Sequence, residues 1–391
     1  MFPEFFEFYN PTKVIYGNGL ATDMKTELDF IDAKRYFIIS DKILKEFGLV
    51  KKVVDGLLSA GFEVVGEFTD IPPNSEVKIV KLCAKHAKES GAQVLLAIGG
   101  GSVIDTAKTA NILICKDGDL LEDYSGANIL TEQLLPLVVI PTTAGTGSEV
   151  SKVAVIYDEE NKVKSAFTDK FLLPDLAVLD PEVTISLMPK LTASTSMDAL
   201  THAIEAYVGL DSSPISDVFA TGAIELIFKN IIKATENGED IEARGGLLVA
   251  SSLAGIAFSH SMVGCVHGMA HAVGGLFNVP HGVANAILLP YGMEYNFEEI
   301  KDKLIKLALI MGERVSGLSP DDAAKRAIQA VRGLTGKLNK MGALAIRLRN
   351  VGVPEDRLLD VAEATVMDGS SFYNPREVIA EDILVYLKKA Y

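Results

Sequence analysis

Apolar and polar positions follow two different patterns along the chain. In the first half, four short apolar runs rich in β-branched and aromatic residues fall at 35–40, 62–68, 92–99 and 136–143. Longer stretches with helical spacing lie between them, such as 41–61 and 74–91. Strands and helices alternating at this spacing predict a parallel sheet that is covered by helices on both faces. We therefore expect a Rossmann-like α/β domain in this half.

The pattern changes near residue 185, after which strand-like runs stop. Apolar positions then recur at helical spacing, in segments 191–209, 216–238, 244–264, 301–312 and 320–342. A chain of 391 residues is also too long for one ordinary core. The sequence therefore predicts an α/β N-terminal domain over residues 1–183, followed by an all-helical C-terminal domain over residues 184–391.

Composition and charge narrow the functional classes. The formal charge of −15 argues against a general binder of nucleic acid. Cys83, Cys115 and Cys265 are too few and too widely spaced for a disulfide framework, which suits a reducing cytosol. The N-terminus lacks the pattern of a signal peptide. The most apolar stretches, 91–101 and 134–145, are shorter than the roughly 20 residues of a membrane helix. We expect a soluble, cytoplasmic protein without nucleic-acid or membrane partners.

Two glycine-rich loops follow predicted strands. The segment AIGGGSVIDTAK (97–108) places three glycines before a helix that is predicted to begin at about Ser102. A helix N-terminus presents unpaired N–H groups, and glycine lets a phosphate approach them. The second loop, PTTAGTGSEVS (141–151), lies at the carboxyl end of its strand, where open α/β sheets bind ligands. The first loop is not a GxGxxG fingerprint, but the two loops together favour a dinucleotide.

Asp41 ends the predicted strand at 35–40 and has two interpretations. An acidic residue at this position can accept hydrogen bonds from the ribose hydroxyls of an adenosine, and it would repel a 2′-phosphate. Its carboxylate can equally cap the helix that follows. The sequence alone supports both.

The histidines form a constellation in the second half. Asp198 and His202 are one helical turn apart, and His267 and His271 repeat that spacing, so each pair shares a helix face. His281 follows, predicted to lie on a turn after Pro280. A carboxylate and several imidazoles brought together make a nitrogen and oxygen site for a divalent first-row metal. His86 and His260, by contrast, have no such pattern.

Taken together, these segments resemble the iron-containing (group III) alcohol dehydrogenase family over essentially the whole chain. The matching pieces are FYNPTKVIYGNG, GGGSVIDTAK, PTTAGTGSEVS, LLPDLAVLDP, MDALTHAIEAY and HGMAHAVGGLFNVPHGVANAILLP. The resemblance implies a fold like that of dehydroquinate synthase. It also implies metal ligation by Asp198, His202, His267 and His281, while His271 would stay off the metal and help proton transfer as the catalytic residue.

The resemblance also implies a set of cofactor-binding residues. Asp41 would lie at the adenosine ribose with Asn74 nearby, and the pyrophosphate would be held by Gly100, Gly101 and Ser102. The positions implied along the rest of the cofactor are Thr142, Thr143, Thr146 and Lys164, with Lys162 a rival for the last.

The predicted function is hydride transfer between NAD, or less readily NADP, and a small primary alcohol or diol or its aldehyde. The metal would act as a Lewis acid that lowers the pKa of the alcohol. We expect Fe²⁺, with Zn²⁺ or another divalent metal as alternatives, because nitrogen and oxygen ligands do not choose among these ions. The alternatives on the same fold are a glycerol dehydrogenase-like enzyme and a dehydroquinate synthase-like lyase, and the resemblance implies a homodimer or larger homo-oligomer.

Overall fold

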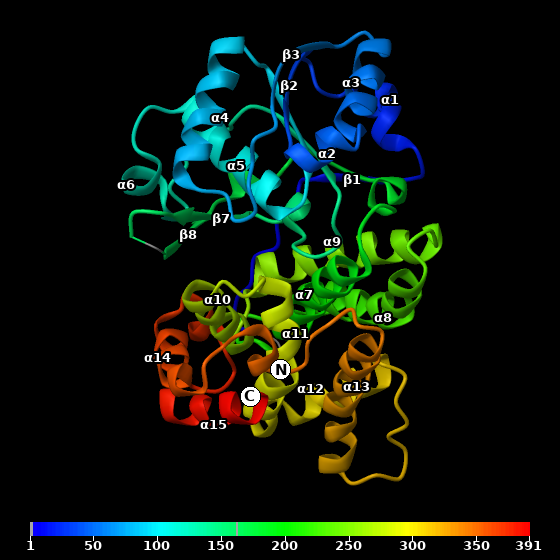
Figure 1. Ribbon diagram of the computed structural model, residues 1–391, viewed down its shortest axis with the longest axis vertical. Helices are drawn as coiled ribbons and strands as arrows, with labels where there is room; N and C mark the ends of the chain where they lie inside the picture. Colours follow the sequence, from blue (N-terminus) through cyan, green and yellow to red (C-terminus); the bar gives the residue numbers. More distant parts are fainter. Residues whose placement is uncertain (1–2, 162) are drawn as a thin grey trace. The chain divides into compact units, whose positions relative to one another are not determined.

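The computed structural model describes residues 3–161 and 163–391, and it divides into two compact units (Figure 1). The α/β unit comprises Tyr9–Thr143 and Gly147–Ser186. The helical unit comprises Leu187–Tyr391, Ala144–Thr146 and the N-terminal segment up to Phe8. The chain therefore passes between the units near residue 186, three residues beyond the predicted boundary, and it also passes between them at two places that the apolar pattern did not indicate.

The α/β unit is built on a six-stranded parallel sheet, in the order β1-β9-β6-β4-β2-β3. Its strands are β1 (Lys13–Tyr16), β2 (Arg35–Ile39), β3 (Glu63–Phe68), β4 (Val94–Gly99), β6 (Leu137–Pro141) and β9 (Leu176–Leu179). A smaller sheet, which the sequence did not predict, contains β5 (Gly126–Ala127), β8 (Val163–Thr168) and β7 (Val153–Asp158). The predicted parallel sheet is confirmed.

Helices cover both faces of this sheet because successive strand residues point to opposite sides. Phe37 and Ile39 of β2 pack in one core with α4 (Val77–Ser90) and α5 (Gly101–Cys115). Tyr36 and Ile38 pack in the other core with α1 (Lys25–Leu28) and α3 (Leu49–Ser59).

The stretch at 41–61, predicted as one helix, is interrupted. Gly48 has φ 78 and separates α2 (Lys42–Glu46) from α3, because a left-handed residue cannot continue a helix. The remaining helix of the unit is α6 (Leu120–Tyr124).

The strand order reverses between β2 and β4. From β2 the chain proceeds outward to β3, and from β4 it proceeds in the other direction to β6. In open α/β sheets, ligands bind outside the carboxyl ends of the strands at such a switch point. Asp41 follows β2, the glycine-rich loop follows β4 and Thr142 follows β6, so the predicted cofactor segments flank this point.

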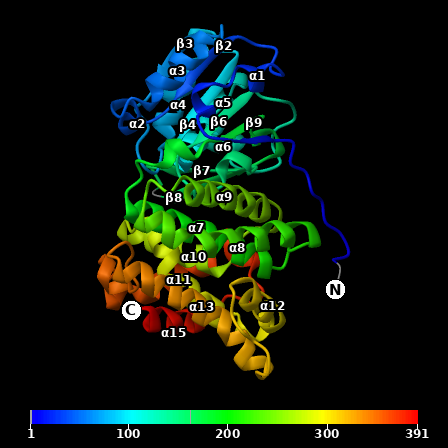
Figure 2. The same cartoon turned by 90° about the vertical axis from the view of Figure 1, so that its right-hand side faces the viewer.

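The helical unit contains α7 (Pro189–Val208), α8 (Pro214–Glu236), α9 (Ile241–Ser261), α10 (Cys265–Phe277), α11 (His281–Tyr295), α12 (Phe297–Ile310), α13 (Pro320–Lys340), α14 (Leu358–Met367) and α15 (Ala380–Ala390). Helices α7, α8 and α9 lie side by side (Figure 2). Their buried residues and those of α10 and α11 form one continuous apolar core. The predicted helical C-terminal region is confirmed.

Among the described residues, α9 is the one helix long and apolar enough to span a membrane by length and composition. The sequence reading of short apolar stretches did not single it out. In the structure, 61% of its most apolar window is buried inside the protein. Helix α9 packs against α7 and α8, which is the packing of a core helix.

Candidate active site

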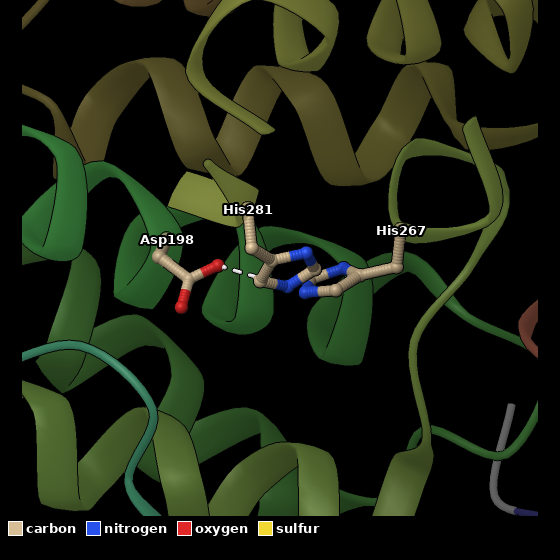
Figure 3. A group of neighbouring side chains, drawn as sticks. All are labelled: Asp198, His267 and His281. Carbon is tan, nitrogen blue, oxygen red and sulfur yellow. Dashed lines mark ion pairs between the residues drawn. The ribbon is translucent and has the colours of Figure 1, made fainter. Parts of the chain in front are cut away.

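Three of the predicted metal ligands come together in the helical unit. Helix α7 supplies Asp198, α10 supplies His267 and α11 supplies His281 (Figure 3). One ligand atom from each lies within 4.8 Å of the other two. His281 Nε2 is 3.4 Å from Asp198 Oδ1. His281 is the first residue of α11, directly after Pro280 at the N-cap, and not part of a turn as predicted.

His202, the fourth predicted ligand, lies beside this cluster. Its ring is packed between Phe258 and His267, with centroid separations of 4.4 and 4.5 Å. Burial lowers the pKa of His202 to about 4, so the imidazole is neutral at pH 7. Its Nδ1 is buried and has no hydrogen-bond partner within residues 3–161 and 163–391. A neutral, buried imidazole with an unused nitrogen is suited to ligating a metal.

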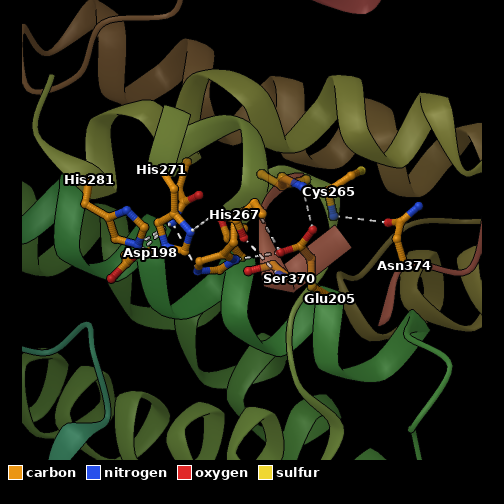
Figure 4. A network of polar contacts seen from close by, with 12 residues as sticks. Asp198, Glu205, Cys265, His267, His271, His281, Ser370 and Asn374 are labelled. Atoms are coloured by element: carbon orange, nitrogen blue, oxygen red, sulfur yellow. Dashed lines mark hydrogen bonds and ion pairs between the residues drawn. The ribbon is translucent and has the colours of Figure 1, made fainter. Parts of the chain in front are cut away.

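Glu205 fixes the orientation of His267. Its Oε2 is 2.5 Å from His267 Nδ1, and its Oε1 accepts a hydrogen bond of 2.7 Å from the N–H of Val266 (Figure 4). Burial raises the pKa of Glu205 to about 7, against the opposing effect of these backbone hydrogen bonds. Because Nδ1–H donates to the carboxylate, Nε2 of His267 keeps its lone pair and faces the cluster.

His271 makes a second histidine–carboxylate pair. Its Nδ1 is 2.9 Å from Asp368 Oδ2, and its ring lies 5.2 Å from that of His281. Burial would raise the pKa of Asp368, but the hydrogen bond and the charge of His271 outweigh it and hold the pKa well below its usual range. Asp368 is therefore ionised. The side chains of His271 and His281 are 30% and 28% exposed, whereas those of Asp198 and His267 are 6% and 3% exposed, so the cluster is open on the side of His271.

The sequence analysis predicted neither of the two carboxylates that pair with these histidines, Glu205 and Asp368. Glu205 follows Asp198 by seven residues and so lies on the same face of α7, which was a usable signal. Asp368 is 97 residues from His271 and carries no such signal. Neither of the other two histidines lies in the cluster: His86 is exposed on α4, and His260 packs on Phe8, with a centroid separation of 4.4 Å.

In the α/β unit, the first glycine-rich loop and its neighbours meet as expected for a nucleotide site. Gly100 precedes the first turn of α5, and Gly101 and Ser102 begin that helix. A Cβ at Gly100 would lie 3.0 Å from Thr143 Oγ1, which is a tight contact, so glycine leaves more room before the first turn of α5. Ser102 Oγ accepts a hydrogen bond of 3.1 Å from the N–H of Asn74.

The remaining cofactor candidates lie on several different segments. Asp41 Oδ1 accepts a hydrogen bond of 2.9 Å from the N–H of Leu44, so the carboxylate does cap α2, and its second oxygen is left for another donor. Thr142 follows β6, whereas Thr146 belongs to the helical unit. Lys164 is exposed on β8, opposite Tyr157 of β7. Lys162 lies outside the described residues.

Comparison with known proteins identifies the family. Residues 11–181 match the model of iron-containing alcohol dehydrogenases, and residues 192–391 match the model of the C-terminal region of that family. The chain belongs to the iron-containing alcohol dehydrogenase family. The NAD-dependent methanol dehydrogenase of Bacillus methanolicus is 36% identical over 98% of this chain and 99% of its own length. The 1,3-propanediol dehydrogenase of Klebsiella pneumoniae is 36% identical over 99% of both chains.

Solved structures of the iron-containing alcohol dehydrogenase family have the same fold. A 1,3-propanediol oxidoreductase superposes with a TM-score of 0.95 at 36% identity, covering 99% of this chain and 100% of that one. The alcohol dehydrogenase from Oenococcus oeni gives a TM-score of 0.94 at 34% identity, covering 99% of this chain and 100% of its own. These matches confirm the predicted fold class, the NAD-linked oxidoreductase class and small alcohols or aldehydes as the class of substrate.

The donor set of this iron-containing alcohol dehydrogenase fits a divalent metal. One carboxylate and three imidazoles lie together, and Asp198 Oδ1, His267 Nε2 and His281 Nε2 converge. Nitrogen and oxygen ligands of this kind suit iron, zinc and their neighbours. Buried His202, whose ring centroid is 4.5 Å from that of His267, offers a further nitrogen beside this set, since its Nδ1 has no hydrogen-bond partner in the described part of the chain.

Proposed function

We propose that this protein is an NAD-dependent dehydrogenase of short primary alcohols or diols, working equally as a reductase of their aldehydes. Asp198, His202, His267 and His281 would hold the catalytic metal, Fe²⁺ before Zn²⁺. The observation that carries the proposal is the convergence of three ligand atoms within 4.8 Å of one another, in a cluster whose histidine tautomer is set by Glu205. A divalent cation held there supplies Lewis acidity that lowers the pKa of an alcohol and polarises an aldehyde carbonyl.

His271 is the group that moves the proton. Its Nδ1–H is engaged by the ionised Asp368, so Nε2 is the atom that accepts a proton from the alcohol and passes it to solvent. Asp368 fixes the ring and stabilises the imidazolium that forms. The partial exposure of His271 supports this role, because a relay needs access to water.

Asp41, Asn74, Gly100, Gly101 and Ser102 would bind the adenosine and pyrophosphate of the cofactor, and Thr142, Thr143, Thr146 and Lys164 would lie along its remainder. The switch point between β2 and β4 and the narrow space at Gly100 support this placement. The carboxylate of Asp41 favours NAD over NADP, since a 2′-phosphate would meet its charge.

The chemistry around the metal cluster favours a small substrate. The ring of Phe258 stacks on His202, so an apolar surface adjoins the ligands. The relatives named above act on methanol and on 1,3-propanediol. We therefore expect primary alcohols and diols of a few carbons to be the best substrates.

We further propose a cytoplasmic homodimer that binds neither nucleic acid nor membrane. Strand β1 is the edge of the six-stranded sheet, and its Val14 and Tyr16 are 42% and 52% exposed. An edge strand with exposed apolar side chains is a template for pairing with a second copy. Light scattering should give the dimer mass, and Val14→Lys should shift it to the monomer, whereas a monomeric wild type would contradict the proposal.

The function is tested by metal-dependent turnover. The chelated protein is loaded with Fe(II) anaerobically or with Zn(II), and reduction of NAD is followed with methanol, ethanol, 1-butanol, 1,2-propanediol and 1,3-propanediol. His267→Ala should lose metal and activity together. His271→Ala should keep its metal and lose rate. Metal content equal to wild type in His267→Ala, by elemental analysis, would overturn the ligand assignment, and no turnover in either direction by the metal-loaded wild type would overturn the reaction.

A further inference from the structure

We propose that Asn285 is a positioning residue for the metal site: its amide holds the carboxylate of Asp198 in the direction needed to ligate a cation. The inference rests on the proposed function, since it assumes that these residues bind a metal. Asn285 is one helical turn after His281 on α11, is fully buried, and lies in the middle of the ligand set.

The contacts of its amide nitrogen single this residue out. Asn285 Nδ2 donates a hydrogen bond of 2.6 Å to Asp198 Oδ1. The same nitrogen lies 3.2 Å from His267 Nε2 and 3.2 Å from His281 Nε2. One amide nitrogen therefore faces the three atoms that the proposed function assigns to the metal.

The orientation of the amide is dictated by these acceptors. His267 Nε2 carries a lone pair, because its Nδ1–H is committed to Glu205. The opposite orientation would point the carbonyl oxygen of Asn285 at the Asp198 carboxylate and the His267 lone pair, which is repulsive. In the observed orientation Oδ1 is buried without a hydrogen-bond partner in the described part of the chain. A native residue that leaves a buried oxygen unsatisfied requires an explanation. The explanation here is that the acceptor atoms of Asp198 and His267 need a hydrogen-bond donor at this position.

An amide NH₂ has only two hydrogens for three acceptors. Each histidine Nε2 has one lone pair and would exchange the amide for a cation, whereas a carboxylate oxygen has more than one lone pair, so Asp198 Oδ1 can accept from Asn285 and still ligate a cation. Hydrogen bonds of this kind to a ligating carboxylate fix its direction, and removing them typically weakens metal binding by about 10- to 100-fold. We assign this role to the bond between Asn285 and Asp198.

The experiment compares Asn285→Leu, which keeps the branched shape of the side chain and removes the donor, with Asn230→Leu as the matched control. Asn230 is also buried in a helix of the same unit, where its Nδ2 donates to the carbonyl of Leu226. Zn(II) affinity is measured by competition with a chromophoric chelator, and the visible spectrum of the Co(II)-loaded protein reports the geometry around the metal. Asn285→Ser serves as a second variant if the leucine does not fold, because a serine hydroxyl is too short to reach Asp198.

The proposal expects a 10- to 100-fold weaker Zn(II) affinity and an altered Co(II) spectrum in the folded Asn285 variant, with both unchanged in Asn230→Leu. Wild-type affinity and spectrum in the Asn285 variant would overturn it, as would an equal loss in the control. If the wild type itself binds no metal, the proposed function fails instead, so the two failures are distinguishable.

Discussion

The pairing of Glu205 with His267 leads to a quantitative prediction. Glutamine at this position keeps the shape of the side chain, and its carbonyl oxygen can still accept from the N–H of Val266. Its NH₂ group, however, would face His267 Nδ1, which now donates a hydrogen to the carboxylate at 2.5 Å. Two donors cannot share this contact, so His267 would move its proton to Nε2. The lone pair that faces Asp198 and His281 would then be lost.

The expected loss is that of a polar partner behind a metal-ligating histidine. Such changes cost about 10- to 100-fold in metal affinity, or about 1.4 to 2.7 kcal/mol. The assay is Zn(II) binding to Glu205→Gln by chelator competition. It is run at pH 8, because burial raises the pKa of Glu205 to about 7 and the wild-type carboxylate is ionised only above that pH.

Glu149→Gln is the matched control, because Glu149 is a buried glutamate of the α/β unit. Its metal affinity should equal that of the wild type. If Glu205→Gln binds Zn(II) as tightly as the wild type, the carboxylate does not set the tautomer, and the reasoning is refuted.

Three further predictions follow from buried or capping groups. Burial lowers the pKa of His202 from 6.5 to about 4. As the pH falls, the unfolded chain therefore binds a proton on this histidine before the folded protein does. The metal-free protein should lose about 3 kcal/mol of stability as pH falls through this window, and urea titrations of His202→Gln should lack that component. Lys108→Met should cost about 3 to 5 kcal/mol in the same assay, because the buried ammonium lies near Asp105 and donates to the carbonyls of Ser151 and Val153; a smaller loss than 1 kcal/mol would contradict this. Asp41→Ser keeps a helix cap and removes the charge, so it should preserve stability while NAD binding weakens and NADP binding improves; unchanged affinity for both by fluorescence titration would leave Asp41 as a cap alone.

Much of the fold could be predicted from the sequence because its signals are local. The strands at 35–40, 62–68, 92–99 and 136–143 are short apolar runs, and a buried parallel strand needs nothing else to be recognised. The helices that follow residue 187 could likewise be predicted from the helical spacing of their apolar residues. The small sheet of β5, β8 and β7 was missed because its burial is one-sided and its strands are partly exposed, so tertiary pairing decides it.

For the site, the spacing of the residues was enough to predict which helix faces carry the metal chemistry, since residues four apart share a face whatever the rest of the chain does. It could place Asp198 with His202 and His267 with His271, and the family resemblance supplied the wider set. Which atoms converge depends on the packing of the helices, because α7, α10 and α11 are brought together by the core they share. The partners that set tautomer and orientation, Glu205 and Asp368, lie 62 and 97 residues from the histidines they bind. A hydrogen bond depends on position in space, and no periodicity in the chain encodes contacts at that separation.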